Sequence, residues 1–150
     1  MHTKADITEF LSQKMIAVVG ASRDRKKFGN SVVRNLLSKG YDVYPVNPNN
    51  SEIEHRHCYH NLMELPRQVE NAIFVVPPQI TETEVRNAKN VGITRIWMQQ
   101  GAESMEAVSY CETNGISVIA GECILMFAEP AGFGHLLHRR LRGAFGKLPT

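Results

Sequence analysis

Four cationic side chains crowd one short stretch near the start of the chain: Arg23, Arg25, Lys26 and Lys27. A single acid, Asp24, lies among them, and the stretch follows an apolar run over 15–19 that ends at Gly20. A helical repeat of apolar residues comes next, and a helix N-terminus offers free N–H groups and a partial positive charge. Together these features predict an anion site for more than one phosphate. The alternative interpretation is a solvated basic turn.

The elements that would position this loop alternate along the chain. Apolar runs predict buried strands over 15–19, 43–46, 72–76, 96–98 and 116–120. Apolar residues at helical spacing predict helices between these strands, ending near Gly40, Gly92 and Gly115. This alternation indicates an α/β fold, namely a single-domain, Rossmann-like, doubly wound parallel sheet of five strands. We expect the strand order 3-2-1-4-5.

Two helix starts carry apparent capping boxes. Asp6 and Glu9 would open a first short helix, and Thr81 and Glu84 would open the helix after the third strand. A hydrophobic staple between Ile80 and Val85 would support the second one. The polar stretch 49–60 is interpreted as loop, and 62–65 as a short helical turn.

Parallel sheets bind ligands beyond the carboxyl ends of their strands, where the segments 20–23, 45–48, 76–78 and 99–101 would converge. The amide of Asn47 stands between two prolines, a stiff wall that would face the ligand. NAD fits poorly, because the loop is not G-x-G-x-x-G and no acid follows the second strand to hold a ribose hydroxyl. Asp42 lies at the beginning of that strand, too far from the expected ligand.

Six segments carry motifs in a recognisable order: 16–24, 26–30, 40–48, 76–78, 97–102 and 123–126. Together they resemble the small stand-alone CoA-binding domain family, which is similar to the N-terminal domain of succinyl-CoA ligase α subunits and ADP-forming acyl-CoA synthetases. The resemblance covers about residues 12–126. The chain departs from the family at 55–60, where a glycine turn often precedes the Cys58-Tyr59 pair.

The resemblance implies a protein that binds CoA or acyl-CoA through its phosphoadenosine and diphosphate and has no independent catalysis. Matched positions supply the expected cofactor-binding residues, with the phosphates on the first loop, the nucleotide at the second strand and the adenine beside the double proline. In chain order they are Gly20, Ala21, Ser22, Arg23, Lys26, Lys27, Asn47, Pro48, Val76, Pro77, Pro78, Gln100 and Gly101. No catalytic residue is assigned, because Glu122 and Glu129 make no convincing acid–base pair. The alternative function is an NAD(P)-linked reductase or a component of an acyl-transfer enzyme.

Two cysteine-containing features have competing interpretations. The His55, His57, Cys58 and His60 cluster matches no standard zinc spacing, so we expect no metal. Cys123 follows the last predicted strand and is either a small apolar filler, which we favour, or a thiol that forms a mixed disulfide with CoA.

Charge and composition limit the remaining possibilities. The formal net charge is +2, yet residues 130–150 hold four bases and no acid, so the rest of the chain is acidic overall. A nucleic-acid-binding domain would be basic throughout, and no apolar run is long enough to span a membrane. Three cysteines and no apolar leader favour a cytoplasmic protein. We expect a CoA-binding domain over 1–129 and a basic tail over 130–150 that packs on the domain or on a partner subunit, with a homodimer possible.

Overall fold

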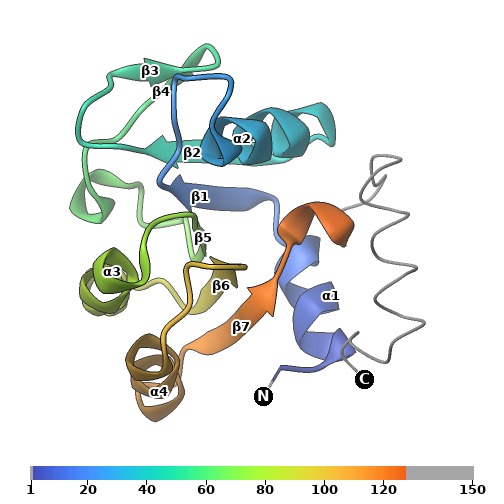
Figure 1. Cartoon of the computed structure of the whole chain (residues 1–150), viewed down its shortest axis with the longest axis vertical. Helices are drawn as coiled ribbons and strands as arrows, with labels where there is room; N and C mark the ends of the chain where they lie inside the picture. Colours follow the sequence, from blue (N-terminus) through green and yellow to red (C-terminus); the bar gives the residue numbers. More distant parts are fainter. Residues whose placement is uncertain (1, 128–150) are drawn as a thin grey trace.

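The computed structural model describes residues 2–127, which form a parallel sheet with helices on both faces (Figure 1). The sheet contains five strands: β1 (Met15–Val19), β2 (Asp42–Val46), β5 (Asn71–Phe74), β6 (Arg95–Gln99) and β7 (Ser117–Glu122). Its helices are α1 (Lys4–Ser12), α2 (Phe28–Ser38), α3 (Pro78–Asn90) and α4 (Met105–Thr113). The predicted Rossmann-like α/β class is confirmed. The expected basic tail over 130–150 lies outside the described residues.

The strand order differs from the expected one. The sheet runs β2-β1-β5-β6-β7, so the third long strand pairs with β1 and not with β2. The connection from β2 to β5 contains only the hairpin β3 (Glu52–Ile53) and β4 (Arg56–His57) and the short 3₁₀ helix η1 (Leu62–Glu64). This connection contains no α-helix that could place the next strand outside β2. The chain instead crosses to the other side of β1, where β5 pairs with β1. The predicted 49–60 loop therefore contains a hairpin.

Two apolar cores, one on each face, hold the layers together. Phe10 of α1 and Leu36 of α2 pack with Trp97 on one face, and Val85 of α3 and Cys111 of α4 pack with neighbours on the other. All five side chains are at most 1% exposed. Each fully buried large side chain of this kind contributes about 1.5–3 kcal/mol. The strands therefore form a rigid base beneath the loops at their carboxyl ends.

Both predicted capping boxes are wrong in position. Helix α1 is capped one turn earlier, by a capping box between Thr3 and Asp6. Helix α3 begins at Pro78, whose missing N–H costs nothing in the first turn, so Thr81 lies inside the helix. Ile80 is 48% exposed and forms no staple. No described helix has both the length and the apolar character needed to cross a membrane.

The hairpin turn has an unusual backbone. Glu54 and His55 have φ of +48° and +62°, in the left-handed region that glycine favours. In the family that the sequence resembles, a glycine turn often occupies this stretch, so the sequence departs from that family where the backbone conformation most favours glycine.

Replacing His55 by glycine should relieve part of this strain. The His55 side chain is 98% exposed, and its Nδ1 lies 3.9 Å from a carboxylate oxygen of Glu52. We expect His55→Gly to raise the free energy of unfolding by about 0.5–1 kcal/mol, since the relieved strain exceeds the added chain entropy. Urea denaturation would measure the gain, with His55→Ala as the control that removes the ring but keeps the strain. A loss in stability for His55→Gly contradicts the argument.

Candidate functional site

Two glycines close the basic loop against the sheet. Gly20 directly follows β1 and has φ of +92°, and a Cβ there would lie 2.2 Å from the Val75 carbonyl oxygen. Gly29, in the first turn of α2, approaches Gly20 so closely that a Cβ would lie 2.1 Å from its carbonyl oxygen. Larger residues would push the helix away from the strand end. The glycines therefore bring the first turn of α2 directly over the end of β1.

The loop itself is ordered by its own polar groups. Ser22 Oγ accepts from the N–H of Asp24 at 3.0 Å, and a carboxylate oxygen of Asp24 accepts from the N–H of Lys26 at 2.9 Å. No side chain caps α2, which begins after Lys27. Within residues 2–127, the N–H groups of Phe28 and Gly29 have no acceptor. An anion over this loop would meet free N–H groups and the positive end of a helix.

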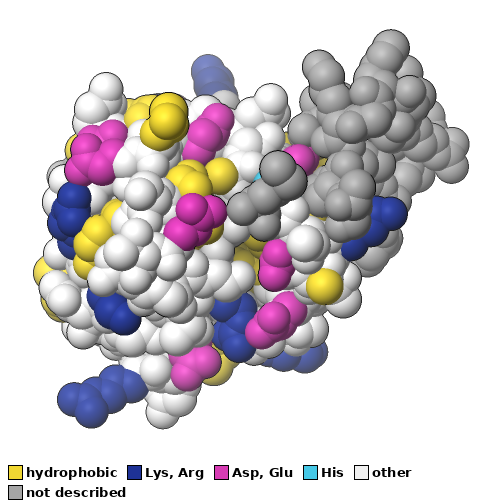
Figure 2. Space-filling view, turned by 90° about the horizontal axis from the view of Figure 1, so that it is seen from below, with side chains coloured by type: hydrophobic (Ala, Val, Ile, Leu, Met, Phe, Trp, Pro, Cys, Tyr) yellow, Lys and Arg dark blue, Asp and Glu magenta, His cyan; other side chains and the backbone are white. Residues whose placement is uncertain are grey.

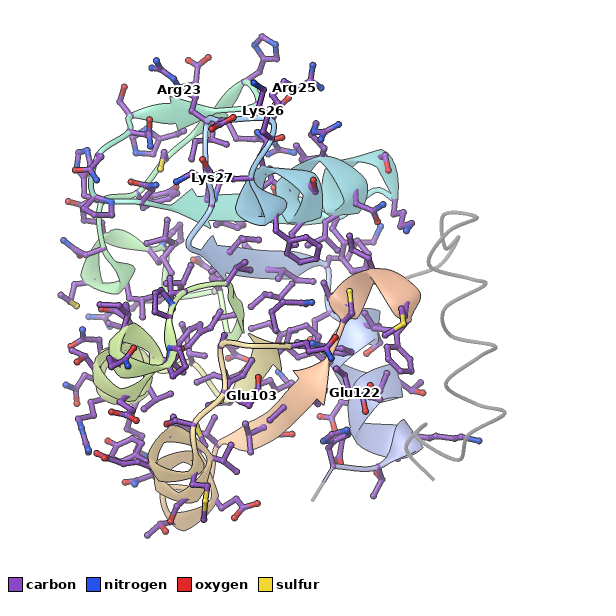
Figure 3. The ribbon with its side chains drawn as sticks, in the orientation of Figure 1. Arg23, Arg25, Lys26, Lys27, Glu103 and Glu122 are labelled. Carbon is purple, nitrogen blue, oxygen red and sulfur yellow. The ribbon has the colours of Figure 1, made fainter. Side chains whose placement is uncertain are left out.

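The four cationic side chains of the loop occupy different positions relative to the hairpin and the sheet. In Figure 3, Arg23, Arg25 and Lys26 lie beside the β3–β4 hairpin, and Lys27 lies nearer the sheet. Glu103 and Glu122, labelled in the same view, are well separated from them. The cations of this loop therefore lie apart from these two acids, although Glu52 and Glu54 of the hairpin line a recess together with Arg23 and Arg25.

A buried polar network, not anticipated from the sequence, ties the loop to the hairpin. Asn30 is fully buried, and its Nδ2 donates to the Ser22 carbonyl at 2.8 Å and to Glu54 Oε1 at 3.0 Å. Arg34 Nε donates to the Asn30 Oδ1 at 2.7 Å. The Glu54 carboxylate also pairs with Arg25 at 3.3 Å. No acid directly follows β2 in the sequence, yet the hairpin returns the Glu54 carboxylate to the basic loop.

An apolar cleft of about 350 Å³ lies on the other side of the loop. It is lined by Phe28 of α2, by 75–77 after β5, by Gln99 at the end of β6 and by 100–102 after it. Gln99 is fixed below it, since its Oε1 accepts from the Ile124 N–H at 3.0 Å. The Gly101 N–H donates to a carboxylate oxygen of Glu103 at 2.7 Å. The structure thus brings Val76, Pro77, Gln100 and Gly101 to one cleft, with Pro78 beginning α3 beside it.

Asn47 joins the end of β2 to the loop. Its Nδ2 donates to the Ala21 carbonyl at 2.8 Å, and its Oδ1 accepts from the Asn49 N–H at 2.8 Å. The exposed Pro48 follows directly. The buried Cys58 thiol donates to the Asn47 carbonyl at 3.6 Å, and burial raises the pKa of this thiol. The amide therefore supports the shape of the loop from the nucleotide side of the predicted site.

The histidine and cysteine cluster at 55–60 and the thiol of Cys123 are the two other candidate sites. Among the described residues, no three His, Cys, Asp or Glu side chains are placed to hold a metal ion. Cys58 is fully buried although His55, three residues earlier, is exposed. Cys123 is 7% exposed and packs into the core on the α1–α2 face, as the filler interpretation expects.

Comparison with known proteins identifies the family. A family model described as a CoA binding domain matches residues 14–129. The chain belongs to this CoA-binding domain family. An ADP-forming acetate–CoA ligase from Archaeoglobus fulgidus is 31% identical in an alignment 146 positions long, which covers 88% of this chain and 21% of the ligase. An uncharacterized protein from Bacillus subtilis, YneT, is 30% identical and is covered over 91% of its length, against 81% of this chain.

A solved structure shares the fold of this chain. A conserved hypothetical protein from Pyrococcus furiosus is 43% identical, with a TM-score of 0.73 over 75% of this chain and 97% of that one. The chain spans 14%, 21% and 28% of the lengths of the first three ADP-forming ligases that it matches. The chain is therefore similar to only a part of each of these longer ligases.

Proposed function

We propose that the protein binds CoA or acyl-CoA at the carboxyl edge of its sheet and has no catalysis of its own. The observation that carries this proposal is the loop 20–27 of a CoA-binding domain family member, closed over a strand end by Gly20 and Gly29. The loop has a charged recess on one side and an apolar cleft on the other. CoA has a matching layout, with a diphosphate between a phosphorylated nucleoside and a largely uncharged pantetheine arm.

In this proposal the diphosphate lies over the loop. The N–H groups of Ala21 and Ser22 and the side chains of Lys26 and Lys27 bind it. Arg23 faces the phosphorylated nucleoside, which Asn47 and Pro48 line. The apolar cleft with Val76, Pro77, Pro78, Gln100 and Gly101 takes the pantetheine arm. This orientation differs from the sequence-based expectation of adenine beside the double proline, because the arginines that suit a third phosphate lie on the opposite side of the loop.

A nicotinamide dinucleotide is the second candidate, since Glu54 lies beside the phosphate loop. Its carboxylate already contacts Arg25 and Asn30, which makes it a poorer acceptor for a ribose with two free hydroxyls. Nucleic acid is disfavoured, because Glu52 and Glu54 lie beside the cations of the loop, and acidic and basic side chains are also interspersed on the face seen in Figure 2. A small polyanionic ligand whose diphosphate lies over the loop 20–27 therefore fits this site better than a nucleic acid does.

Thermal unfolding with four ligands tests this function. At a ligand concentration 100 times Kd, CoA should stabilise the protein by about 2.7 kcal/mol, measured as a rise in Tm. Dephospho-CoA should stabilise less at equal concentration, and NAD and NADP least. A larger shift with NAD or NADP than with CoA would contradict the proposal and favour the reductase.

A further inference from the structure

A second recess lies between the basic loop and the β3–β4 hairpin. It has a volume of about 500 Å³ and is lined by Arg23, Arg25, Glu52, Glu54 and His55. Figure 3 shows both arginines at this side of the loop, away from the apolar cleft. The recess combines two permanent cations with carboxylates. This mixture fits a ligand that has both an anionic group and a hydrogen-bond donor better than it fits a bare phosphate.

The Glu54 carboxylate holds Arg25 at the edge of this recess by contacting one side of its guanidinium. The Arg25 Nε lies 3.3 Å from Glu54 Oε1, and the same oxygen accepts from the fully buried Asn30 at 3.0 Å. Among residues 2–127, no acceptor bonds to either Nη group of Arg25, whose side chain is 68% exposed. The carboxylate thus fixes the guanidinium while its outer edge stays open to a phosphate.

The backbone at Glu54 supports a role for its side chain. Glu54 has φ of +48° in a turn where glycine would be unstrained. Strained positions of this kind cluster at functional sites, where a side chain is required in spite of the cost. Glu54 is 21% exposed, and the charge it places here weakens any purely electrostatic capture of anions. Its position is better explained by orientation of Arg25 and by hydrogen bonding to a ligand.

Building on the proposed function, we propose that this recess binds the 3′-phosphoribose of CoA. Arg23 and Arg25 pair with the 3′-phosphate, and Glu54 positions Arg25 and accepts a hydrogen bond from the free 2′-hydroxyl. A ribose that carries one phosphate beside one hydroxyl supplies a partner for both the guanidinium groups and the carboxylate. A ribose with two hydroxyls leaves the guanidinium edges without an anion. The recess therefore selects CoA over its dephosphorylated form.

Calorimetric Kd values for CoA and dephospho-CoA test this assignment. The wild type should bind CoA at least about tenfold more tightly, the effect of one charge-assisted hydrogen bond. Arg25→Gln should lower the ratio of the two Kd values toward one, by weakening CoA binding and leaving dephospho-CoA binding unchanged, and the remaining preference comes from Arg23. Arg67→Gln is the matched control, because Arg67 is also exposed but lies between η1 and β5, outside the recess. This control should keep the wild-type ratio.

The isomers 3′,5′-ADP and 2′,5′-ADP test the role of Glu54. They exchange the positions of hydroxyl and phosphate, and the wild type should prefer 3′,5′-ADP. Glu54→Gln keeps an acceptor for Asn30 but removes the ion pair with Arg25, so the preference should fall toward parity. A merely structural Glu54 would leave the isomer preference unchanged in the folded variant.

The outcomes separate this inference from the proposed function. Failure of the wild type to bind either CoA or dephospho-CoA would overturn both. Equal binding of the two forms, or an unchanged ratio in Arg25→Gln, would overturn the 3′-phosphoribose assignment while CoA binding stands.

Discussion

Replacement of Gly20 by alanine should destabilise the protein by about 4 kcal/mol or more, a loss at the extreme of single substitutions. The new Cβ would lie 2.2 Å from the Val75 carbonyl oxygen and 2.8 Å from Val76 Cγ1. The φ of +92° adds backbone strain to this collision. Neither contact atom belongs to a long flexible side chain, so the end of β5 must shift. The shift would also deform the apolar cleft, and CoA binding should be lost with stability.

Gly92→Ala separates the collision from the strain. Gly92 has φ of +87°, nearly that of Gly20, but a Cβ added there would meet nothing within 4 Å. This variant should lose only about 1–2 kcal/mol, the cost of a left-handed conformation for alanine. Urea denaturation of both variants measures the difference. Similar losses in the two variants would show that the close approach of Gly20 to β5 is relieved by small movements.

The strands and the basic loop could be predicted from the sequence because each depends on local information. A run such as Ile16–Val19 is too apolar for any position except a strand covered on both faces, and it is buried throughout. Arg23, Lys26 and Lys27 are close in sequence, so any turn that follows β1 brings their charges together. Gly20 and Gly29 mark the turn and the close helix approach for the same reason.

The strand order and the buried network could not be predicted in this way because both depend on contacts between distant segments. Val18 pairs with Ile73, 55 residues later, and no local pattern distinguishes this partner from one next to β2. Glu54 meets Asn30 only after the β3–β4 hairpin folds back, since the two are 24 residues apart. A polar stretch with histidines gives no signal for that hairpin. The acid that seemed to be missing after β2 is therefore supplied by a turn.

Helix starts show a third kind of error, in which a local pattern competes with a stronger one nearby. Asp6 does take part in a capping box, but as the third residue of the helix whose cap is Thr3. Thr81 matches the same pattern, yet Pro77 and Pro78 already fix the backbone dihedrals that begin α3. The capping-box pattern therefore correctly predicts that a helix begins nearby, but it gives the wrong first residue for both α1 and α3.

Lys27→Glu should abolish most of the CoA-induced rise in Tm while the free protein keeps its stability. Lys27 is the exposed residue before α2, and its side chain makes no capping hydrogen bond. An acid at this position interacts favourably with the helix dipole, so the fold should tolerate it. A polyanionic ligand would meet a negative charge in place of a cation. The expected loss in affinity is about 100-fold, from a charge-assisted contact removed and a repulsion added.

Lys4→Glu provides the matched control, since it makes the same change of charge at the start of α1, away from the basic loop. It should leave the CoA-induced shift unchanged, so a general effect of net charge is separated from a local one. Added salt should reduce the wild-type shift, because screening weakens exposed charge contacts. If Lys27→Glu keeps both its stability and the full CoA-induced shift, the diphosphate does not lie over the loop 20–27. CoA binding would then need another part of the carboxyl edge, and the cations of this loop would be solvated surface groups.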